Sequence, residues 1–591
     1  MYPRSWRRCI FYASLFSLGL LLVSVSPSIR PFLFEAARSQ AVRSVMAEGM
    51  DARPLQIAVT WFALVTITLH LLVGVTAVGL TKLSEVARIS VPERRLGTVF
   101  LWFAAMAATL MLRCAVDFPR SHAGGYYGTV ASYEVAGLRL ADVCLFAFAM
   151  LTGVVASLAI LRTRSWQTRA LYATSAVAVA GLALVAIMHS EPSTASVPDG
   201  APPERPHLIV IGIDSLRSDV ARDLTANGQL PHLRTLLRES TWFSDATTPL
   251  ARTFPAWISI LTGRAPSEAN VVCNLTPREL VKANPTVASR LGEAGYHTVF
   301  ATDEVRFSNI DESYGFDQAE TPAIGAADFL IPQFSDIPLI NLVANTPIAR
   351  ELFPQLYANR AVTFIYQPET FVARLRRSVR FDRPTFLAVH LTAPHWPYVT
   401  AHSPARRATG RPWDDSFAEY LDSVKRADGQ LGELMSWLRD AGALESAVVV
   451  VLSDHGEALY RAGDSLVEAS APNLPGVRVT PAGHGTSVLS GPQFQVLLGF
   501  RGYGPMAQRI RPGISQFPVA LEDIAPTLAE FVGLDDATES DGISLATVLR
   551  GDQGSKRHID RSRYTETGFN VISPMKAGFD AERIAAQGAW H

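Results

Sequence analysis

Cysteine and net charge are both scarce in this chain, and each scarcity excludes a class of protein. Only four of the 591 residues are cysteine, and one of them, Cys273, follows residue 190. The C-terminal part therefore lacks the cysteine pair that a disulfide framework within it would need. The chain carries 53 Lys and Arg against 54 Asp and Glu, a net charge of −1. This balance excludes a dedicated nucleic-acid binder, which needs a basic face.

Long uncharged runs dominate the sequence up to about residue 190. A bilayer span needs about 20 predominantly apolar residues. Five stretches reach or approach that length: residues 9–26, 55–80, 97–116, 141–161 and 170–188. The first could be a secretory signal, because Arg4, Arg7 and Arg8 precede it, but the four later stretches favour a retained signal anchor. Residues 1–190 are thus predicted to form a transmembrane domain of about five helices.

Basic residues in the short loops predict the orientation of these spans. They gather before the first stretch, between the second and third, and between the fourth and fifth, although the loop after the first stretch also holds four arginines. Five spans place the three gathered segments on one face, and Lys- and Arg-rich loops face the cytoplasm. We therefore expect a multi-pass protein of the plasma (inner) membrane with an extracytoplasmic (periplasmic) C-terminal part.

The sequence beyond the apolar half changes character twice. Residues 191–206 are rich in Pro, Ser and Ala without an apolar period, which predicts a linker. In residues 207–591, β-branched runs alternate with amphipathic stretches, and the clearest runs are 207–213, 297–302, 385–391, 447–453 and 494–500. Continuous apolar strands suit a sheet covered by helices on both faces. The predicted fold class is α/β, with a mostly parallel sheet in a three-layer α/β/α sandwich.

Acidic and imidazole side chains follow three of these runs. The first run stops at Asp214, the third leads into His395, and the fourth ends at Asp454 and His455. Ligands of open α/β sheets bind beyond the carboxyl ends of the strands. A turn or helix-cap role would explain Asp214 taken alone. The three strand ends together predict a site on one edge of the sheet.

A short helix is predicted to begin at Thr253. Pro255 suits the first turn and Gly263 suits the C-terminal stop. The Thr253 hydroxyl is then either a helix cap or a group held in the positive potential of the helix N-terminus, where an anionic phosphate or sulfate ester binds.

In this order and spacing, the motifs resemble those of the sulfatase and alkaline phosphatase superfamily over about residues 207–550. Matching positions are Thr253, Pro255, Ala256 and Leu261-Thr262-Gly263 in the nucleophile motif, IDSLRSD and SDHGE in the two metal-ligand strands, PHWP in the substrate-histidine loop, and His484 in AGHGTS. The resemblance implies an alkaline-phosphatase-like, metal-dependent hydrolase or transferase domain.

Three departures from the sulfatase pattern bear on the chemistry. Sulfatases convert a Cys or Ser to formylglycine, which Thr253 cannot form because of its β-methyl group. Trp257 replaces the usual Arg, and Ser215 stands where many sulfatases have a second metal-binding Asp. A Thr nucleophile instead resembles membrane-anchored lipoteichoic acid synthases and phosphoethanolamine transferases. These enzymes also have five spans and an external domain, although their first metal ligand is typically Glu rather than an Asp such as Asp214.

The predicted site combines a nucleophile, one divalent cation and two substrate-binding imidazoles. Its members are Thr253 as nucleophile and metal ligand, Asp214, Asp454 and His455 as further metal ligands, and His395 and His484 on the substrate. Mixed oxygen and nitrogen ligands suit Zn²⁺ or Mn²⁺. Around it, we expect Glu457 to support the metal site, Arg217 and Asp219 to pair with each other, and His390 to face the core.

The chain is accordingly predicted to be an enzyme. The first reading is a phosphotransferase that moves a phospholipid head group, phosphoethanolamine or glycerophosphate, through Thr253 to an envelope glycan or lipid. A phosphoric or sulfuric ester hydrolase with water as acceptor is one alternative, and a non-catalytic lipid-sensing protein of the same fold is another. Residues 322–380 are expected to form a substrate-specific insert, and no role is assigned to the Thr565–Gly568 turn.

Overall fold

The structure is a computed structural model that describes residues 3–38, 53–135, 138–163, 205–274, 276–308, 310–322, 326–405, 412–461, 463–464, 482–488, 490–534, 540–551 and 562–567. The chain divides into two compact units. We call Met1–Glu191, Gly325–Gln367 and Thr400–Arg407 the helical unit, and Pro192–Ile324, Pro368–Val399 and Ala408–His591 the sheet unit.

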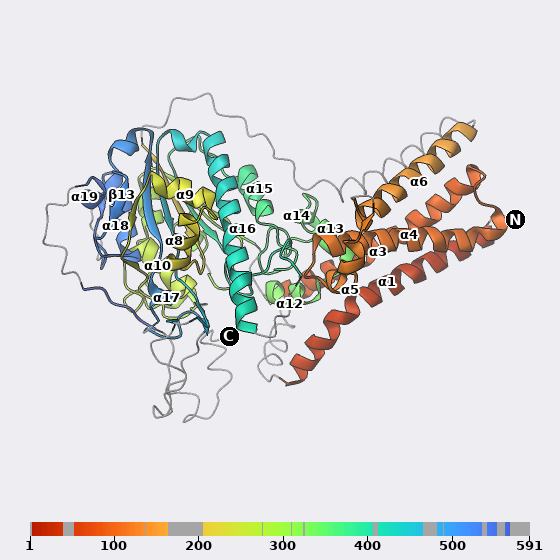
Figure 1. Ribbon diagram of the computed structural model, residues 1–591, viewed down its shortest axis with the longest axis horizontal. Helices are drawn as coiled ribbons and strands as arrows, with labels where there is room; N and C mark the ends of the chain where they lie inside the picture. Colours follow the sequence, from red (N-terminus) through yellow and green to blue (C-terminus); the bar gives the residue numbers. More distant parts are fainter. Residues whose placement is uncertain are drawn as a thin grey trace. The chain divides into compact units, whose positions relative to one another are not determined.

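Long apolar helices build most of the described part of the helical unit (Figure 1). They are α1 (Pro3–Arg38), α3 (Arg53–Val86), α4 (Arg95–Asp117) and α6 (Leu140–Arg162). Within the described residues, four helical segments are long and apolar enough to cross a membrane, and large apolar side chains such as Leu101 and Leu161 are exposed on them. These features indicate membrane anchoring. The predicted fifth span, residues 170–188, lies outside the described residues, as does the predicted linker up to residue 204.

Small residues bring α1 and α3 into close approach. A β-carbon added at Gly74 would lie 2.6 Å from the Ser17 hydroxyl and 2.7 Å from the Ala13 carbonyl oxygen. Only glycine leaves room for the α1 backbone at this point. Close packing over small residues is a common way for membrane helices to associate, because lipid tails remove the hydrophobic drive that operates in water.

A stretch far along the sequence completes the helical unit. Helices α12 (Ala326–Phe334), α13 (Pro338–Val343) and α14 (Ala349–Leu352) join it, and Ile337, Ile340 and Phe353 share a core cluster with Val65 and Phe118. From the sequence, residues 322–380 are predicted to form a substrate-specific insert within residues 207–591. In the structure its apolar side chains pack against the helices that precede residue 191, and its role in substrate binding stays a prediction.

Polar contacts fasten the same stretch. The His122 Nδ1 atom of α5 (His122–Ala131) lies 3.0 Å from a carboxylate oxygen of Asp336, and the His122 backbone N–H donates to that carboxylate at 2.7 Å. The Trp61 indole N–H donates to the Leu352 carbonyl at 3.1 Å. The described residues 326–367 are thus joined to the long apolar helices by both apolar and directional contacts.

An eight-stranded sheet forms the centre of the sheet unit, in the order β13-β4-β12-β9-β3-β8-β6-β7. Its strands are β3 (His207–Ile213), β4 (Thr241–Phe243), β6 (His297–Thr302), β7 (Gln318–Glu320), β8 (Thr385–Leu391), β9 (Ala447–Leu452), β12 (Leu498–Tyr503) and β13 (Gly513–Ser515). β12 runs antiparallel to both neighbours, and the other pairs are parallel. The mostly parallel sheet is confirmed. The fifth predicted strand is shifted, because Gly491–Phe494 form the short helix α17.

Helices cover both faces of this sheet (Figure 1). Leu208 and Val210 of β3 enter a core with side chains of α10 (Thr253–Thr262), α11 (Val287–Glu293) and α18 (Ile524–Phe531). Successive strand residues point to opposite faces, and on the other face His207 contacts Phe381, which contacts Trp437 of α16 (Pro412–Asp440). Burial from both sides explains why the central strands read as unbroken apolar runs. The three-layer α/β/α architecture is therefore confirmed.

Candidate metal and nucleophile site

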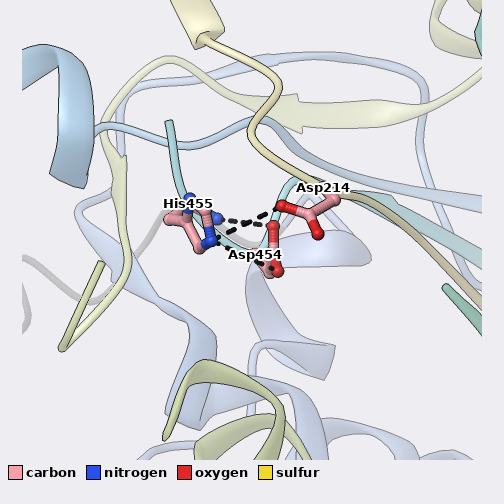
Figure 2. A group of neighbouring side chains, drawn as sticks. All are labelled: Asp214, Asp454 and His455. Carbon is pink, nitrogen blue, oxygen red and sulfur yellow. Dashed lines mark hydrogen bonds and ion pairs between the residues drawn. The ribbon is translucent and has the colours of Figure 1, made fainter. Parts of the chain in front are cut away.

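Neighbouring parallel strands deliver three ionisable side chains to one point. Asp214 follows β3 directly, and Asp454 and His455 follow β9, which pairs with β3. One ligand atom from each of the three lies within 4.8 Å of the others, and all three residues are buried. Figure 2 shows the carboxylate groups of Asp214 and Asp454 and the ring of His455 turned toward one another.

Backbone and hydroxyl donors fix the two carboxylates. Ser215 Oγ donates to Asp214 Oδ1 at 2.9 Å, and the Ser215 backbone N–H donates to Asp454 Oδ1 at 3.3 Å. Ser215 holds a left-handed φ of 57°, a strained conformation that is common at functional sites. Asp454 Oδ2 accepts no hydrogen bond from the described residues. This orphaned, buried oxygen is therefore available to a cation.

The tautomer of His455 also suits a cation. Its Nδ1–H donates to the Gly456 carbonyl at 2.9 Å, so Nε2 carries the lone pair in the neutral ring. Nε2 lies 3.5 Å from Asp214 Oδ1 and 3.7 Å from Asp454 Oδ2. One electron-rich atom of each residue therefore converges on the same point. The three residues could hold a metal ion, and the donor set of carboxylates and imidazole suits Zn²⁺ or Mn²⁺.

The electrostatics of the cluster point the same way. Burial and the neighbouring charge of Asp454 raise the pKa of the Asp214 carboxyl. Burial opposes a charge on His455, but the carboxylates of Asp454 and Asp214 outweigh it and raise the pKa of the ring. Both shifts favour the protonated forms, because two carboxylates are buried close together. A bound metal ion would supply the positive charge that protons otherwise provide.

The Thr253 hydroxyl lies beside this cluster. Thr253 is the first residue of α10, which ends at Gly263 in the left-handed conformation with φ of 71°. Arg252 occupies the N-cap position, and no side chain caps the helix. The cap interpretation of Thr253 is therefore wrong. Its Oγ1 instead lies 3.3 Å from His455 Nε2.

The two other predicted histidines extend the site. The His484 ring stacks on His455 with centroids 4.2 Å apart, and the His395 ring lies edge-on to His484 at 5.3 Å. Glu457 Oε2 lies 2.9 Å from His484 Nδ1, and His395 Nδ1–H donates to the Trp396 carbonyl at 2.8 Å. All six predicted site residues are thus brought together, while their individual roles stay predictions.

His390 was underestimated from the sequence. It is buried in β8, as predicted, yet its Nε2 lies 3.3 Å from Asp454 Oδ2 and 3.7 Å from Asp214 Oδ2. The signal was its position, one residue before the end of a strand that pairs with β3. The predicted pair of Arg217 and Asp219 is present at 2.8 Å.

Trp257 belongs to the core beneath the site. Its ring meets His390 at 5.1 Å and Phe300 at 5.5 Å between centroids, both edge to face. A β-carbon at Gly212 would lie 2.6 Å from the Trp257 ring. The side chain at 257 therefore fills a space that glycine leaves open beneath the strand.

Comparison with known proteins gives a consistent result. Residues 206–499 match the family model described as sulfatase. The chain is 24% identical over 405 residues to the choline-sulfatase of Rhizobium meliloti (strain 1021), covering 59% of this chain and 72% of that protein. It is 26% identical over 391 residues to human arylsulfatase A, covering 60% and 69%.

Solved structures with a similar fold include two phosphonate monoester hydrolases. The enzyme of Agrobacterium radiobacter has a TM-score of 0.48 at 17% identity, covering 65% of this chain and 83% of its own. The enzyme of Silicibacter pomeroyi has a TM-score of 0.44 at 19% identity, covering 60% and 78%.

Proposed function

Because residues 206–499 form a sulfatase-family domain, this chain is an enzyme of the alkaline phosphatase superfamily, and we propose that it is a phosphotransferase with Thr253 as its nucleophile. The donor is a phospholipid whose head group, phosphoethanolamine or glycerophosphate, passes to an envelope glycan or lipid. One observation carries the proposal: the Thr253 hydroxyl at a helix N-terminus lies 3.3 Å from the Nε2 atom of a buried carboxylate–imidazole cluster.

The residue at position 253 favours phosphoryl over sulfuryl transfer. Sulfatases use an aldehyde made from Cys or Ser, and a threonine side chain cannot be converted to it. A hydroxyl attacks phosphorus directly and can leave again, which makes transfer to a second acceptor possible. The membrane helices support a lipid donor, since they keep the enzyme at the surface where such a donor is concentrated. We place the site on the periplasmic side of the inner membrane.

The chain's residues divide the work of the reaction. Asp214, Asp454, His455 and Thr253 would hold one Zn²⁺ or Mn²⁺, which when bound lowers the pKa of the hydroxyl and neutralises the ester's charge. Thr253 Oγ forms a bond to phosphorus as the bond to the departing lipid alkoxide breaks. His484, fixed by Glu457, protonates that alkoxide.

The second half of the reaction reverses these roles. The acceptor hydroxyl attacks the phosphorus of the phosphodiester on Thr253, His484 takes its proton, and the Thr253 oxygen departs. His395, buried beside His484, holds a non-bridging oxygen through both halves. Water in place of the acceptor turns the same sequence into hydrolysis, which is the second candidate function. The two curated relatives support that candidate, because both are sulfatases, and sulfatases are hydrolases.

The test uses Thr253→Ala and Thr253→Ser in the full-length protein, with Thr235→Ala as the control because Thr235 is exposed on α9 (Pro231–Arg238). Turnover should be abolished by Thr253→Ala, reduced but retained by Thr253→Ser, and unchanged in the control, with equal metal content throughout. Undiminished turnover in Thr253→Ala would refute the nucleophile.

Mass spectrometry of the peptide that contains Thr253, after incubation with membranes, then identifies the donor. A phosphoethanolamine or glycerophosphate adduct supports the phosphotransferase. Bare phosphate on Thr253 supports a phosphomonoesterase. A protein without bound metal and without an adduct would be a non-catalytic sensor.

A further inference from the structure

A buried arginine directly precedes the nucleophile. Arg252 is 7% exposed, and its Nε is buried without a hydrogen-bond acceptor among the described residues. Within the described part of the chain Arg252 forms no ion pair with a carboxylate, and the ionisable group that interacts with it is the Cys273 thiol. A buried N–H group without an acceptor is destabilising by about 1–3 kcal/mol, and by more when it carries charge. Such a residue is retained at this cost where a ligand provides the missing charge.

The course of the side chain brings it to the wall of the site. A β-carbon added at Gly485 would lie 2.7 Å from Arg252 Cγ and 2.8 Å from its Nε, so the side chain runs closely along the Gly485 backbone. Gly485 follows His484, whose ring stacks on His455. Arg252 therefore lies between the start of α10 and the loop that carries His484.

Two features hold that loop against the arginine. Gly485 has a left-handed φ of +64°, which a larger residue adopts only with strain. Thr567 Oγ1 donates to the Gly485 carbonyl at 2.8 Å. A side chain at position 485 would displace Arg252, so the glycine keeps a space that the guanidinium group uses.

The buried carboxylates around the site would repel an anionic substrate unless positive charge offsets them. Asp214, Asp454 and Glu457 are all buried there, and position 257 holds a core tryptophan that offers no charge. An anionic ester that approaches Thr253 meets these carboxylates. A bound divalent ion would offset part of that repulsion, and the guanidinium of Arg252, which directly precedes Thr253, would offset more.

We propose that Arg252 binds the non-bridging oxygens of the phosphoryl group that Thr253 attacks. The inference rests on the proposed function and deepens it. A guanidinium presents parallel N–H donors that match two oxygens of one phosphate group, so the preferred ligand is a phosphodiester, whose two non-bridging oxygens are free. The helix N-terminus adds its positive potential at the same point.

The experiment measures binding of inorganic phosphate to the full-length protein by titration calorimetry, with and without bound metal. Arg252→Gln should weaken phosphate binding about 10- to 100-fold, as expected for loss of charged hydrogen bonds. Arg252→Lys should recover part of the affinity, because the charge remains and the fork is lost. Arg238→Gln is the matched control, since the Arg238 side chain is 76% exposed. Metal content should be equal in all variants.

Phosphate affinity of Arg252→Gln equal to that of the wild type would overturn the proposal. If that variant does not fold, Arg252→Lys decides: unchanged phosphate affinity with a lowered melting temperature would show a purely structural role. The Thr253→Ala variant separates the two proposals. Undiminished turnover there, together with weak phosphate binding in Arg252→Gln, would remove the nucleophile and leave Arg252 as an anion site.

Discussion

Replacement of His390 by Leu tests whether this histidine, in addition to the metal ligands, stabilises the buried carboxylates of Asp214 and Asp454. The imidazole of His390 is fully buried, and its Nε2 faces one oxygen of each carboxylate, at 3.3 Å from Asp454 and 3.7 Å from Asp214. Leucine has a similar volume, so the packing against Trp257 is largely kept. The substitution removes a polar partner from two buried carboxylates and little else.

The expected loss of metal affinity follows from the position of His390 beside two metal ligands. Groups that orient metal ligands from outside typically change metal affinity 10- to 100-fold, so we expect His390→Leu to weaken metal binding by about that factor, which is about 1.4 to 2.7 kcal/mol. Without metal the loss is greater. A buried carboxylate that loses its partner destabilises a fold by about 3–5 kcal/mol. The melting temperature should therefore fall further in chelator than in saturating metal.

The assay is competition between the full-length protein and a chelator for Zn²⁺ or Mn²⁺, with thermal melting recorded beside it. His207→Leu is the matched control: it is a buried histidine at the opposite end of β3, roughly 20 Å along the strand, whose Nδ1 accepts from the Thr385 N–H at 3.1 Å. It should lower the melting temperature and leave metal affinity unchanged. Equal metal affinity in His390→Leu and the wild type would refute the reasoning.

Two further predictions concern the helical unit. Gly74→Leu should lower the melting temperature in detergent, because its β-carbon would meet Ser17 and Ala13, at a cost of about 1–3 kcal/mol for overpacking. Gly79→Leu on the same helix is the control and should be neutral, since nothing lies within 4 Å of its β-carbon. Equal melting temperatures of the two variants would contradict the close packing of α1 on α3. The hydrogen bond to Asp336 raises the pKa of His122, so this contact is fully stabilising below about pH 6.5 and is lost as the pH rises through the raised value. The backbone amides of residues 331–345 should therefore be better protected from hydrogen exchange at about pH 6 than at about pH 8.5, after correction for intrinsic rates. This difference should vanish in His122→Asn. Equal protection of the wild type at both pH values would disprove the role of the His122–Asp336 pair.

Much of the sheet unit followed from sequence because its signals are local. Strands buried on both faces must be apolar throughout, so β3, β6, β8 and β9 were predicted within one residue of their bounds. The start of α10 followed from Pro255 and Gly263. The start of β12 could not be predicted, because nothing in the apolar run from 494 to 500 indicates that Phe494 is the last residue of a short helix.

What sequence could not supply was the pairing of distant surfaces. Residues 325–367 are apolar in patches, as any insert in a folded domain would be, and only the structure shows that these patches match α3 and α4. His390 had the same difficulty. In an apolar run it reads as a core residue, and its proximity to Asp214 and Asp454 depends on the order of strands in the sheet.

The packing around Trp257 bears on where the site can hold a positive charge. The tryptophan at 257 requires Gly212, because a β-carbon there would lie 2.6 Å from its ring, and it packs against His390 beneath the carboxylates. An arginine placed at 257 would bury its charge in that core. In our proposal the cation of the site is Arg252 instead, and Gly485 leaves space for its side chain. We therefore expect that Trp257→Arg alone would not supply a charge to the site, because position 257 is surrounded by packed core side chains.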